Sequence, residues 1–374
     1  MNKFCRVFFI DGVRTPFQLS GTGYKNLDPY QLASKSLDSL IGKYDNLKND
    51  FDNVIFGNVI QDSKTSNIAR ESMLVSNMNK NKPANTVTMA CISSNKAITD
   101  GFNSIAVNNS SSVIAGGVET MSDLPIKLSK PLRKLLFESR KWKTNMDKLK
   151  GISSLKVKDI GIEIPSITEF STKETMGYSA DKLCQTWNVS REDQDEFAVR
   201  SHKLASLAQK SFLLKDVIKF DDEIIKDNII KHNSNLDKLK MLKPVFVKNT
   251  GTITAGNSSP LTDGASACLL ANENYVKKYN LKPKTEILDY IYYGTDPTNE
   301  LLLGPAYATS LLLHKNNLKV KDIDVFEIHE AFAGQLLANL NAMNSTEFSK
   351  RLNINDKIPV PVPIKITSWF FLTN

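Results

Sequence analysis

The structural pattern changes at the centre of the stretch Thr86-Val87-Thr88-Met89-Ala90-Cys91-Ile92-Ser93-Ser94-Asn95-Lys96-Ala97-Ile98. The β-branched residues at its start predict a strand, and the apolar residues after Cys91 recur at the spacing of a helix. Cys91 therefore lies where a strand ends and a helix begins. Unpaired amide donors and the helix dipole at such a junction favour a thiolate and can receive an oxyanion. The alternative is a structural role, since free cysteines are among the most buried residues.

The segments on either side of this stretch alternate between strand and helix patterns. Apolar runs predict strands at residues 7–10, 54–60 and 112–117, and helices are expected from Asp28-Pro29 and over 67–78. The last of these strands closes with two glycines, so the backbone there approaches another segment closely or turns sharply. Strands that alternate with helices predict an α/β fold.

A polar, lysine-rich segment interrupts this alternation from Met121 to about Pro244. Its pattern is mostly helical, with a start like a capping box at Ser190-Arg191-Glu192-Asp193. We expect an insertion that lies over the α/β core as a lid or substrate-binding unit. The α/β pattern returns after Gly251, with strands expected at 265–271, 286–293 and 325–328 and helices at 305–314 and 331–343.

The 374 residues carry a formal net charge of +8 that is spread over scattered lysines. They lack the clustered arginine and aromatic residues of a nucleic-acid groove, so no nucleic-acid partner is expected. The stretch Lys127–Lys150 mixes basic and apolar residues, which leaves a membrane-surface association as the minority alternative. No apolar run reaches the roughly 18 residues that a membrane span needs. The first predicted strand starts almost at the N-terminus, so we expect either a cytosolic protein or a missing true N-terminus.

The four cysteines, Cys5, Cys91, Cys184 and Cys268, lie far apart in the sequence. Because they form no CxxC pair, we expect neither a disulfide framework nor a metal site. His329 follows an apolar run and precedes a helix start, which suits either a functional histidine or a buried structural one. The other three histidines lie on polar segments and are expected at the surface.

Seven stretches of the chain together resemble the thiolase family. The resemblance runs from about Cys5 to about Trp369 in the family's order, and its motifs are highly specific. The stretch Ile328-His329-Glu330-Ala331-Phe332 has His where many members have Asn, a feature shared with the group of mitochondrial trifunctional-protein β-subunits, which are long-chain 3-ketoacyl-CoA thiolases. The other stretches are Asp11-Gly12-Val13-Arg14-Thr15-Pro16-Phe17, Met89-Ala90-Cys91-Ile92-Ser93-Ser94-Asn95, Gly116-Gly117-Val118-Glu119-Thr120-Met121-Ser122, Glu174-Thr175-Met176-Gly177, Thr254-Ala255-Gly256-Asn257-Ser258-Ser259 and Asp263-Gly264-Ala265.

The resemblance implies two similar βαβαβαββ halves in five α/β layers, with a mostly helical loop domain inserted in the first half. The expected division is residues 1–120 for the first part of the N-terminal half, 121–245 for the loop domain and 246–270 for the end of that half. Residues 271–369 would form an incomplete C-terminal half, and 370–374 a tail outside the family.

The resemblance also assigns roles to individual residues. Cys91 would accept the acyl group as a thioester, and its own amide would contribute to an oxyanion hole. His329 would hold a water at a second oxyanion site. The substrate-binding residues would be Ser258 and Ser259 on the pantetheine arm of coenzyme A, with Met176 of the loop domain and Phe332 beside them. Coenzyme A is then a co-substrate, and no permanently bound cofactor is expected.

The chain departs from the family near its C-terminus. No histidine follows His329 and no cysteine follows Cys268, whereas the family completes its site there with Gly-His-Pro and Cys-x-Gly motifs. The last residues, from Trp369 on, do not continue the family pattern. We therefore expect a fragment that lacks the C-terminal catalytic segment and has a weakened or absent activity.

The leading interpretation is acyl transfer to coenzyme A in fatty-acid β-oxidation, as in a 3-ketoacyl-CoA thiolase. The main alternative is a non-catalytic thiolase-like subunit that binds a CoA ester or a partner. A condensing enzyme such as a ketosynthase shares the architecture but not the thiolase-like motifs. The resemblance further implies a homodimer, a hydratase/dehydrogenase α-subunit as a partner, and a mitochondrial location.

Overall fold

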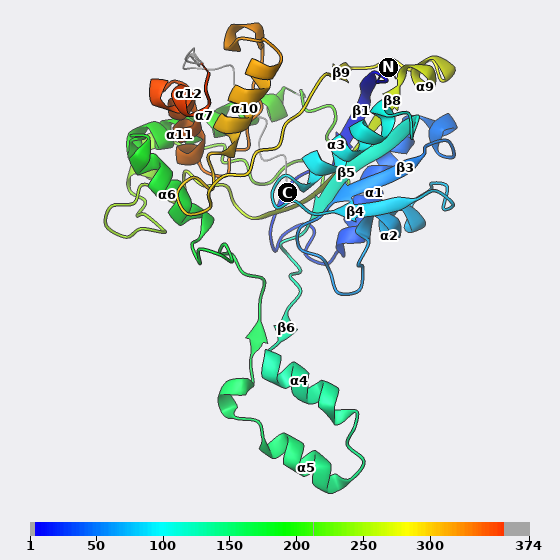
Figure 1. Cartoon of the computed structure of the whole chain (residues 1–374), viewed down its shortest axis with the longest axis vertical. Coiled ribbons are helices and arrows are strands. Elements are labelled where there is room, and N and C mark those ends of the chain that lie inside the picture. Colours follow the sequence, from blue (N-terminus) through cyan, green and yellow to red (C-terminus); the bar gives the residue numbers. More distant parts are fainter. Residues whose placement is uncertain (1–3, 212, 355–374) are drawn as a thin grey trace.

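The computed structural model describes residues 4–211 and 213–354, and its centre is a seven-stranded mixed sheet (Figure 1). The strand order is β4-β3-β5-β8-β1-β9, and β2 pairs with one end of β8. β3 runs parallel to β4 and β5, whereas β8 is antiparallel to β5 and β1. The strands are β1 (Val7–Arg14), β2 (Gln18–Leu19), β3 (Asn53–Gly57), β4 (Ala84–Val87), β5 (Ser112–Glu119), β8 (Thr262–Asn272) and β9 (Thr285–Ile287).

Helices cover both faces of this sheet because the side chains of each strand alternate between the faces. Val54 and Phe56 of β3 belong to the apolar cluster that includes α1 and α2. Ile55, between them, belongs to the cluster that includes α3. The helices here are α1 (Pro29–Ile41), η1 (Asp45–Leu47), α2 (Ile68–Val75), α3 (Ser93–Ala106) and α9 (Glu273–Lys278).

A second, mostly helical region forms around α11 (Ala333–Met343), nine of whose eleven residues are buried. The strongest helix contacts of α11 are with α6 and α7. This region has its own apolar cluster, which includes Leu336 and Phe348. Its other elements are α6 (Met176–Thr186), α7 (Arg191–Lys210), α8 (Leu236–Lys240), α10 (Gly304–Lys315), η3 (Val320–Asp322) and α12 (Thr346–Arg351).

An arm formed by residues 127–163 extends away from both regions (Figure 1). Neither of its two helices contains a buried residue. Its elements are β6 (Lys127–Leu128), α4 (Lys130–Ser139), α5 (Asn145–Ser153), η2 (Val157–Asp159) and β7 (Ile162–Glu163). No helix in the described part of the chain combines the length and apolar character that crossing a membrane requires.

The helix starts expected at Asp28 and Ser190 are confirmed, since these residues are the N-caps of α1 and α7. The helix expected over 67–78 is α2, which has Asn67 as its N-cap and ends at Val75. Two expected strands are wrong. The segment 325–328 forms no regular strand, and the one expected over 286–293 ends at Ile287. Local apolar pattern alone predicted both, but a strand also needs a neighbour that pairs along its length. Within the described residues the C-terminal part adds one strand, β9, to the sheet, and the expected tail at 370–374 and Trp369 lie outside them.

Candidate active site

A tight turn presents Cys91 between β4 and α3. Ala90, just before it, has a φ of +45°, a left-handed conformation that is strained for a residue with a side chain. The Ser93 hydroxyl fixes the turn, since it accepts a hydrogen bond from the Met89 N–H (2.8 Å) and donates one to the Ala90 carbonyl (2.6 Å). The Cys91 N–H faces its own thiol, while the Ile92 N–H bonds the Met89 carbonyl. Cys91 itself is exposed, so the turn offers a thiol and an amide donor to a ligand.

Two glycines let the first turn of α3 lie directly on the sheet. A Cβ at Gly57 would come within 2.4 Å of the Ser93 carbonyl carbon, and a Cβ at Gly117 within 2.1 Å of the Ser94 hydroxyl oxygen. Gly116 is equally constrained, since its Cβ would lie 2.1 Å from the Ser266 carbonyl oxygen. The expected close approach at the end of β5 is therefore confirmed, and it sets the height of the Cys91 turn above the sheet.

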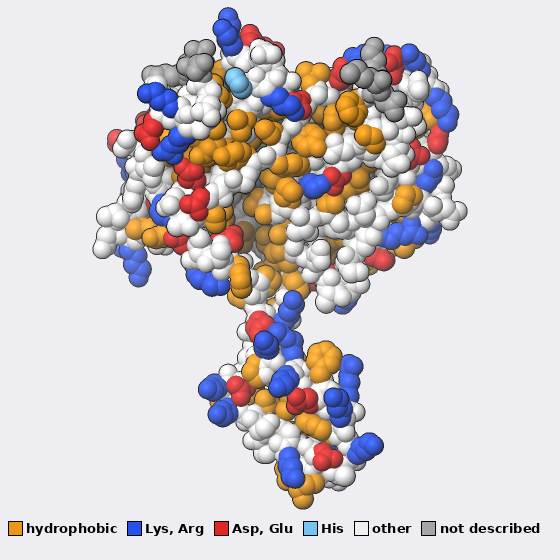
Figure 2. All heavy atoms as spheres, viewed as in Figure 1, with side chains coloured by type: hydrophobic (Ala, Val, Ile, Leu, Met, Phe, Trp, Pro, Cys, Tyr) orange, Lys and Arg blue, Asp and Glu red, His pale blue; other side chains and the backbone are white. Residues whose placement is uncertain are grey.

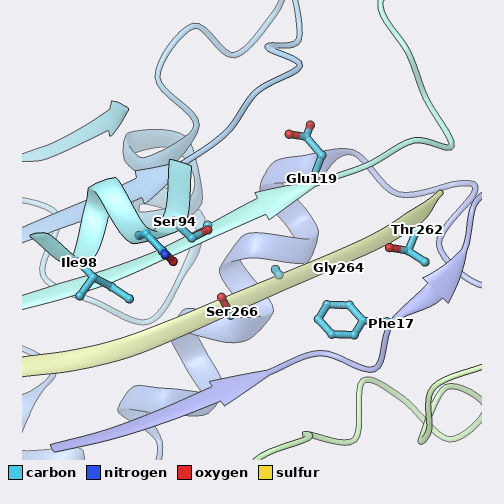
Figure 3. Close-up of a pocket in the computed structure, with 10 residues that line it drawn as sticks. Phe17, Ser94, Ile98, Glu119, Thr262, Gly264 and Ser266 are labelled. Atoms are coloured by element: carbon cyan, nitrogen blue, oxygen red, sulfur yellow. The ribbon is translucent and has the colours of Figure 1, made fainter. Parts of the chain in front are cut away.

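A cavity of about 190 Å³ opens beside this first turn of α3. Figure 3 shows Ser94 and Ile98 on α3, Glu119 at the end of β5 and Phe17 near β8 around it. Most of the remaining wall is backbone and small side chains of β8. The cavity is thus a mainly apolar space with a carboxyl group at one end.

The thiol of Cys91 is less acidic than the helix-terminus argument predicts. Desolvation by surrounding protein atoms is the largest influence and raises its pKa; its own N–H lowers the pKa, and the Glu119 carboxylate raises it. The amide at the junction lowers the thiol pKa, as expected, but desolvation outweighs it and the net shift is upward. The helix end supplies amide dipoles, but the surroundings oppose a negative charge.

Glu119 was not singled out from the sequence, although it lies within one of the quoted motifs. Its side chain is 2% exposed and accepts hydrogen bonds from the backbone N–H groups of Val59 (2.8 Å) and Ile60 (3.2 Å) and from Asn58 Nδ2 (3.2 Å). Desolvation outweighs these bonds and raises its pKa to about 7. A buried, ionisable residue at a strand end is a recognisable signal, but its partners lie about sixty positions away in the sequence.

The residues expected to bind substrate meet in the helical region, where α11 begins. Ser258 and Phe332 form an isolated β-bridge, and the Ser259 N–H donates to the Ala331 carbonyl (2.9 Å). The Phe332 ring packs edge-on against Phe246, with ring centroids 6.0 Å apart. The loop 251–259 therefore lies along the chain that follows His329.

Met176, the first residue of α6, packs against the same apolar cluster as Phe332. His329 is half-buried, and burial lowers the pKa of its imidazole, which favours the neutral form. The structure thus gathers Met176, Ser258, Ser259 and Phe332 with the His329 segment. Cys91 itself lies on the turn between β4 and α3.

Buried polar residues hold the loop 251–259 in place, and sequence reasoning missed them. The Asn257 side chain accepts from the Thr254 N–H (2.8 Å) and donates to Asp195 (3.0 Å). Asp181 accepts from the backbone N–H groups of Thr252 and Ile253. The loop is therefore a preformed surface and not only a turn-rich connector.

The other cysteines of the core and His202 are shielded from water. Burial raises the pKa of both Cys184 and Cys268 to about 12, so neither thiol is a nucleophile at neutral pH. His202 was expected at the surface and is instead half-buried, with its pKa lowered to about 4 mainly by desolvation. Within residues 4–211 and 213–354, no three His, Cys, Asp or Glu side chains form a group that could hold a metal ion.

Several known proteins are similar to this chain in sequence. The mitochondrial trifunctional enzyme subunit beta of Bos taurus is 47% identical over 368 residues, which cover 97% of this chain and 77% of the relative. A probable 3-ketoacyl-CoA thiolase of Caenorhabditis elegans is 48% identical over 350 residues, which cover 92% of this chain and 78% of the relative.

Solved structures show the same fold. The acetyl-CoA acetyltransferase of Bacillus anthracis has a TM-score of 0.78 and 30% identity, covering 98% of this chain and 90% of that one. Human mitochondrial 3-ketoacyl-CoA thiolase in complex with CoA has a TM-score of 0.78 and 28% identity, covering 97% and 89%. The profile described as thiolase, N-terminal domain, matches residues 7–274, and the one for the thiolase C-terminal domain matches 281–360. On this fold and these matches, the chain belongs to the thiolase family.

Proposed function

We propose that the chain carries out the acyl transfer of a 3-ketoacyl-CoA thiolase in fatty-acid β-oxidation, with Cys91 as the nucleophile. As an acyltransferase of this family it uses coenzyme A as a substrate and no permanently bound cofactor. The observation that carries the proposal is the exposed Cys91 on a strained turn between a strand and a helix. Strain at a single position is typical of sites where geometry serves chemistry.

The reaction requires a thiol nucleophile and donors for oxyanions. The Cys91 sulfur attacks the 3-keto carbon, and the bond between carbons 2 and 3 breaks. Its electrons leave on carbon 2 as the enolate of acetyl-CoA, which takes up a proton. The thiol of a second coenzyme A then attacks the acyl thioester and releases Cys91. An N–H such as that of Cys91, aimed at the developing oxyanion, is worth about 3 to 4 kcal/mol of barrier in comparable sites.

The helical region would bind the coenzyme A arm and the enolate oxygen. Ser258 and Ser259 lie on the preformed loop, and Phe332 and Met176 supply apolar surface beside it. His329, kept neutral by its lowered pKa, suits the holding of a water as a hydrogen-bond donor. These roles are part of the proposal.

The alternative is a thiolase-like subunit that binds a CoA ester without turning it over. Acylation of Cys91 and complete thiolysis are therefore separate outcomes and are measured separately.

The test is incubation of the purified chain with a long-chain 3-ketoacyl-CoA, with and without coenzyme A. We expect mass spectrometry to find the acyl group on the peptide that contains Cys91, and Cys91→Ser to abolish it. Cys268→Ser, which removes a buried thiol, is the matched control and should label as the unaltered chain does. Thiolysis at the rate of an intact thiolase supports the enzyme, and labelling without turnover supports the binding subunit. Absence of labelling would overturn the assignment of Cys91.

The division of the chain into two halves with residues 121–245 inserted in the first belongs to the same proposal. It is supported by the pairing of β5 with β8, in which Glu119 lies opposite Gly264. The chain thus leaves the sheet and re-enters it at neighbouring points, as an insertion requires. A second copy of the chain and a hydratase/dehydrogenase α-subunit are the partners proposed from the family resemblance. The proposed mitochondrial location is supported by relatives named mitochondrial trifunctional enzyme subunit beta.

A second proposal concerns the arm, which we assign to a membrane surface rich in anionic lipid. Residues 127–163 contain eleven Lys and Arg against four Asp and Glu. Figure 2 shows these basic side chains interspersed with apolar ones over the arm. Phe137 and Leu149 are each 64% exposed on the two helices. Basic and apolar residues on one exposed helical surface favour binding at an anionic interface.

Co-sedimentation with vesicles tests this assignment. We expect binding to vesicles of anionic phospholipid and little binding to vesicles of phosphatidylcholine. Reversing two charges, in Arg140→Glu with Lys141→Glu, should reduce the bound fraction at least tenfold, at about 1 kcal/mol per charge. Lys319→Glu with Lys321→Glu changes the net charge equally outside the arm and should leave binding unchanged. An equal loss of vesicle binding in both double variants would reject the arm as the binding surface.

A further inference from the structure

We propose that Glu119 is a positioning residue for Cys91: it is hydrogen-bonded through Asn58 to the residues that lead into the Cys91 turn, and its charge moderates the reactivity of the thiol. The inference rests on the nucleophilic role proposed above for Cys91. Its test reads thiol reactivity without turnover, so a failure of the coupling and a failure of the proposed function are distinguishable.

Hydrogen bonds connect the Glu119 carboxyl group to the segment that leads into the Cys91 turn. Asn58 connects the two, because its side chain donates to Glu119 and to the Val118 carbonyl (3.0 Å). Its backbone N–H donates to the Val87 carbonyl (3.1 Å), and its carbonyl accepts from the Thr88 hydroxyl (2.6 Å). Asn58 therefore forms hydrogen bonds both to the residues that lead into the Cys91 turn and to the Glu119 carboxyl group.

The cavity beside α3 places Glu119 close to the residues that follow Cys91 in the chain. Glu119 lines it together with Ser94 and Asn95, which follow Cys91 on the first turn of the helix. Among the residues that the structure describes, Glu119 is a charged group that acts on the Cys91 thiol; it disfavours the thiolate, as desolvation does to a larger extent. Because the carboxyl group is buried, water screens its charge less than it would at the surface.

The other charged groups on the adjoining elements are engaged elsewhere. On α3, Lys96 and Asp100 form an ion pair with each other. On β8, Asp263 accepts from the N–H groups of Met121 (2.7 Å) and Ser122 (3.1 Å). After β3, Asp62 accepts from the Lys64 N–H. Of the charged groups described on these elements, Glu119 is the one that acts on the thiol.

The Glu119 carboxyl group titrates in the neutral range, since its pKa is raised to about 7. Below this pH the carboxyl is neutral and the thiolate is less opposed. Above it the carboxylate repels the thiolate and slows its formation. The chain thus has a built-in group that moderates the rise of Cys91 reactivity as pH increases.

The test is the rate of Cys91 carbamidomethylation by iodoacetamide between pH 6 and pH 9, read on the Cys91 peptide by mass spectrometry. Glu119→Gln resembles the neutral carboxyl. At pH 6 we expect Cys91 to react as fast in this variant as in the unaltered chain. At pH 8 to 9 we expect it to react about three to ten times faster, which corresponds to a thiol pKa lower by up to one unit. A ratio that does not change with pH would overturn the inference.

Asp263→Asn is the matched control, because it neutralises a buried carboxylate on the neighbouring strand β8. Its rate relative to the unaltered chain should be the same at every pH, and an acceleration equal to that of Glu119→Gln would also overturn the inference. If Glu119→Gln does not fold, the unaltered chain provides the measurement. The logarithm of its rate should then rise with pH with a slope below one between pH 6 and 8, and a slope of one throughout would reject the coupling.

Discussion

The Cys91 turn and the arm at residues 127–163 are the two exposed features of the molecule to which we assign a function, and they differ in their support. The turn rests on backbone atoms of β3 and β5 through Gly57 and Gly117. The arm extends away from the body, and its helices bury no residue (Figure 1). A nucleophile must be held to within fractions of an ångström, whereas a charged apolar surface needs only composition and exposure. Substitutions in the turn should therefore lower the free energy of unfolding more than substitutions in the arm.

The largest difference in the free energy of unfolding should appear between substitutions of two arginines that each pair with a carboxylate. Arg14 donates two hydrogen bonds to Asp227 (2.7 and 2.9 Å) in a buried pair that ties β1 to the inserted segment. Arg14→Ala leaves a buried carboxylate unpaired and should lower the free energy of unfolding by about 3 to 5 kcal/mol. Arg133→Ala removes the exposed pair with Glu163 in the arm and should cost less than about 1 kcal/mol. Urea unfolding of both variants measures this, and equal costs would contradict the comparison.

Two glycines provide a second contrast of the same kind. Gly57→Ala places a Cβ 2.4 Å from the backbone of Ser93, so α3 must shift, at a cost of about 2 to 4 kcal/mol. A Cβ at Gly161, in the arm, meets nothing within 4 Å, and Gly161→Ala should change stability by about 0.5 kcal/mol at most. Thermal unfolding of both gives the answer. A Gly57→Ala variant as stable as the unaltered chain would show that the turn does not need its close contact with the sheet.

The pH dependence of stability is the third test. The pKa of Glu119 is about 7 in the folded chain against an ordinary 4.5, so its contribution to stability is fully present below pH 4.5 and is lost as pH rises through 7. This loss amounts to up to about 3 kcal/mol. The unfolding free energy of the unaltered chain minus that of Glu119→Gln should fall by this amount between pH 4.5 and pH 8. A constant difference across this range would mean that Glu119 is already ionised in acid.

The smallest effect on folding is expected in α4 of the arm. Phe137 is 64% exposed, and Phe137→Ser should change the unfolding free energy by no more than about 0.5 kcal/mol. The same change at Phe56, which is fully buried under α1 and α2, is the matched control and should be severe. A loss above 2 kcal/mol at Phe137 would indicate that the arm packs against protein in solution and is not free.

Much of the fold was predictable because its signals are local. The caps at Asp28 and Ser190 depend on a few adjacent residues. The two adjacent glycines of β5 predicted a close approach of another segment, although they do not specify which segment it is. The strand expected at 325–328 failed because whether an apolar run pairs depends on neighbours that the run itself does not specify.

The candidate site was only partly predictable for a related reason. Sequence motifs identified Cys91, His329 and the loop 251–259, since each stands out in its own stretch. They did not reveal that Glu119 opposes the thiolate, because that effect needs the burial of one strand end beside another segment. Nor did they show that Asn257 and Asp181 hold the loop, since those hydrogen bonds join distant parts of the chain.

The sequence by itself determined the family, the α/β class and the position of the candidate nucleophile, because motifs and periodicity are properties of adjacent residues. Only the tertiary structure decided how Cys91 behaves. The thiol is exposed, the turn before it is strained, and a buried carboxyl group that titrates near pH 7 acts on it. Burial and charge are shared among segments far apart in the chain, so the ease with which this thiol ionises is a property of the fold.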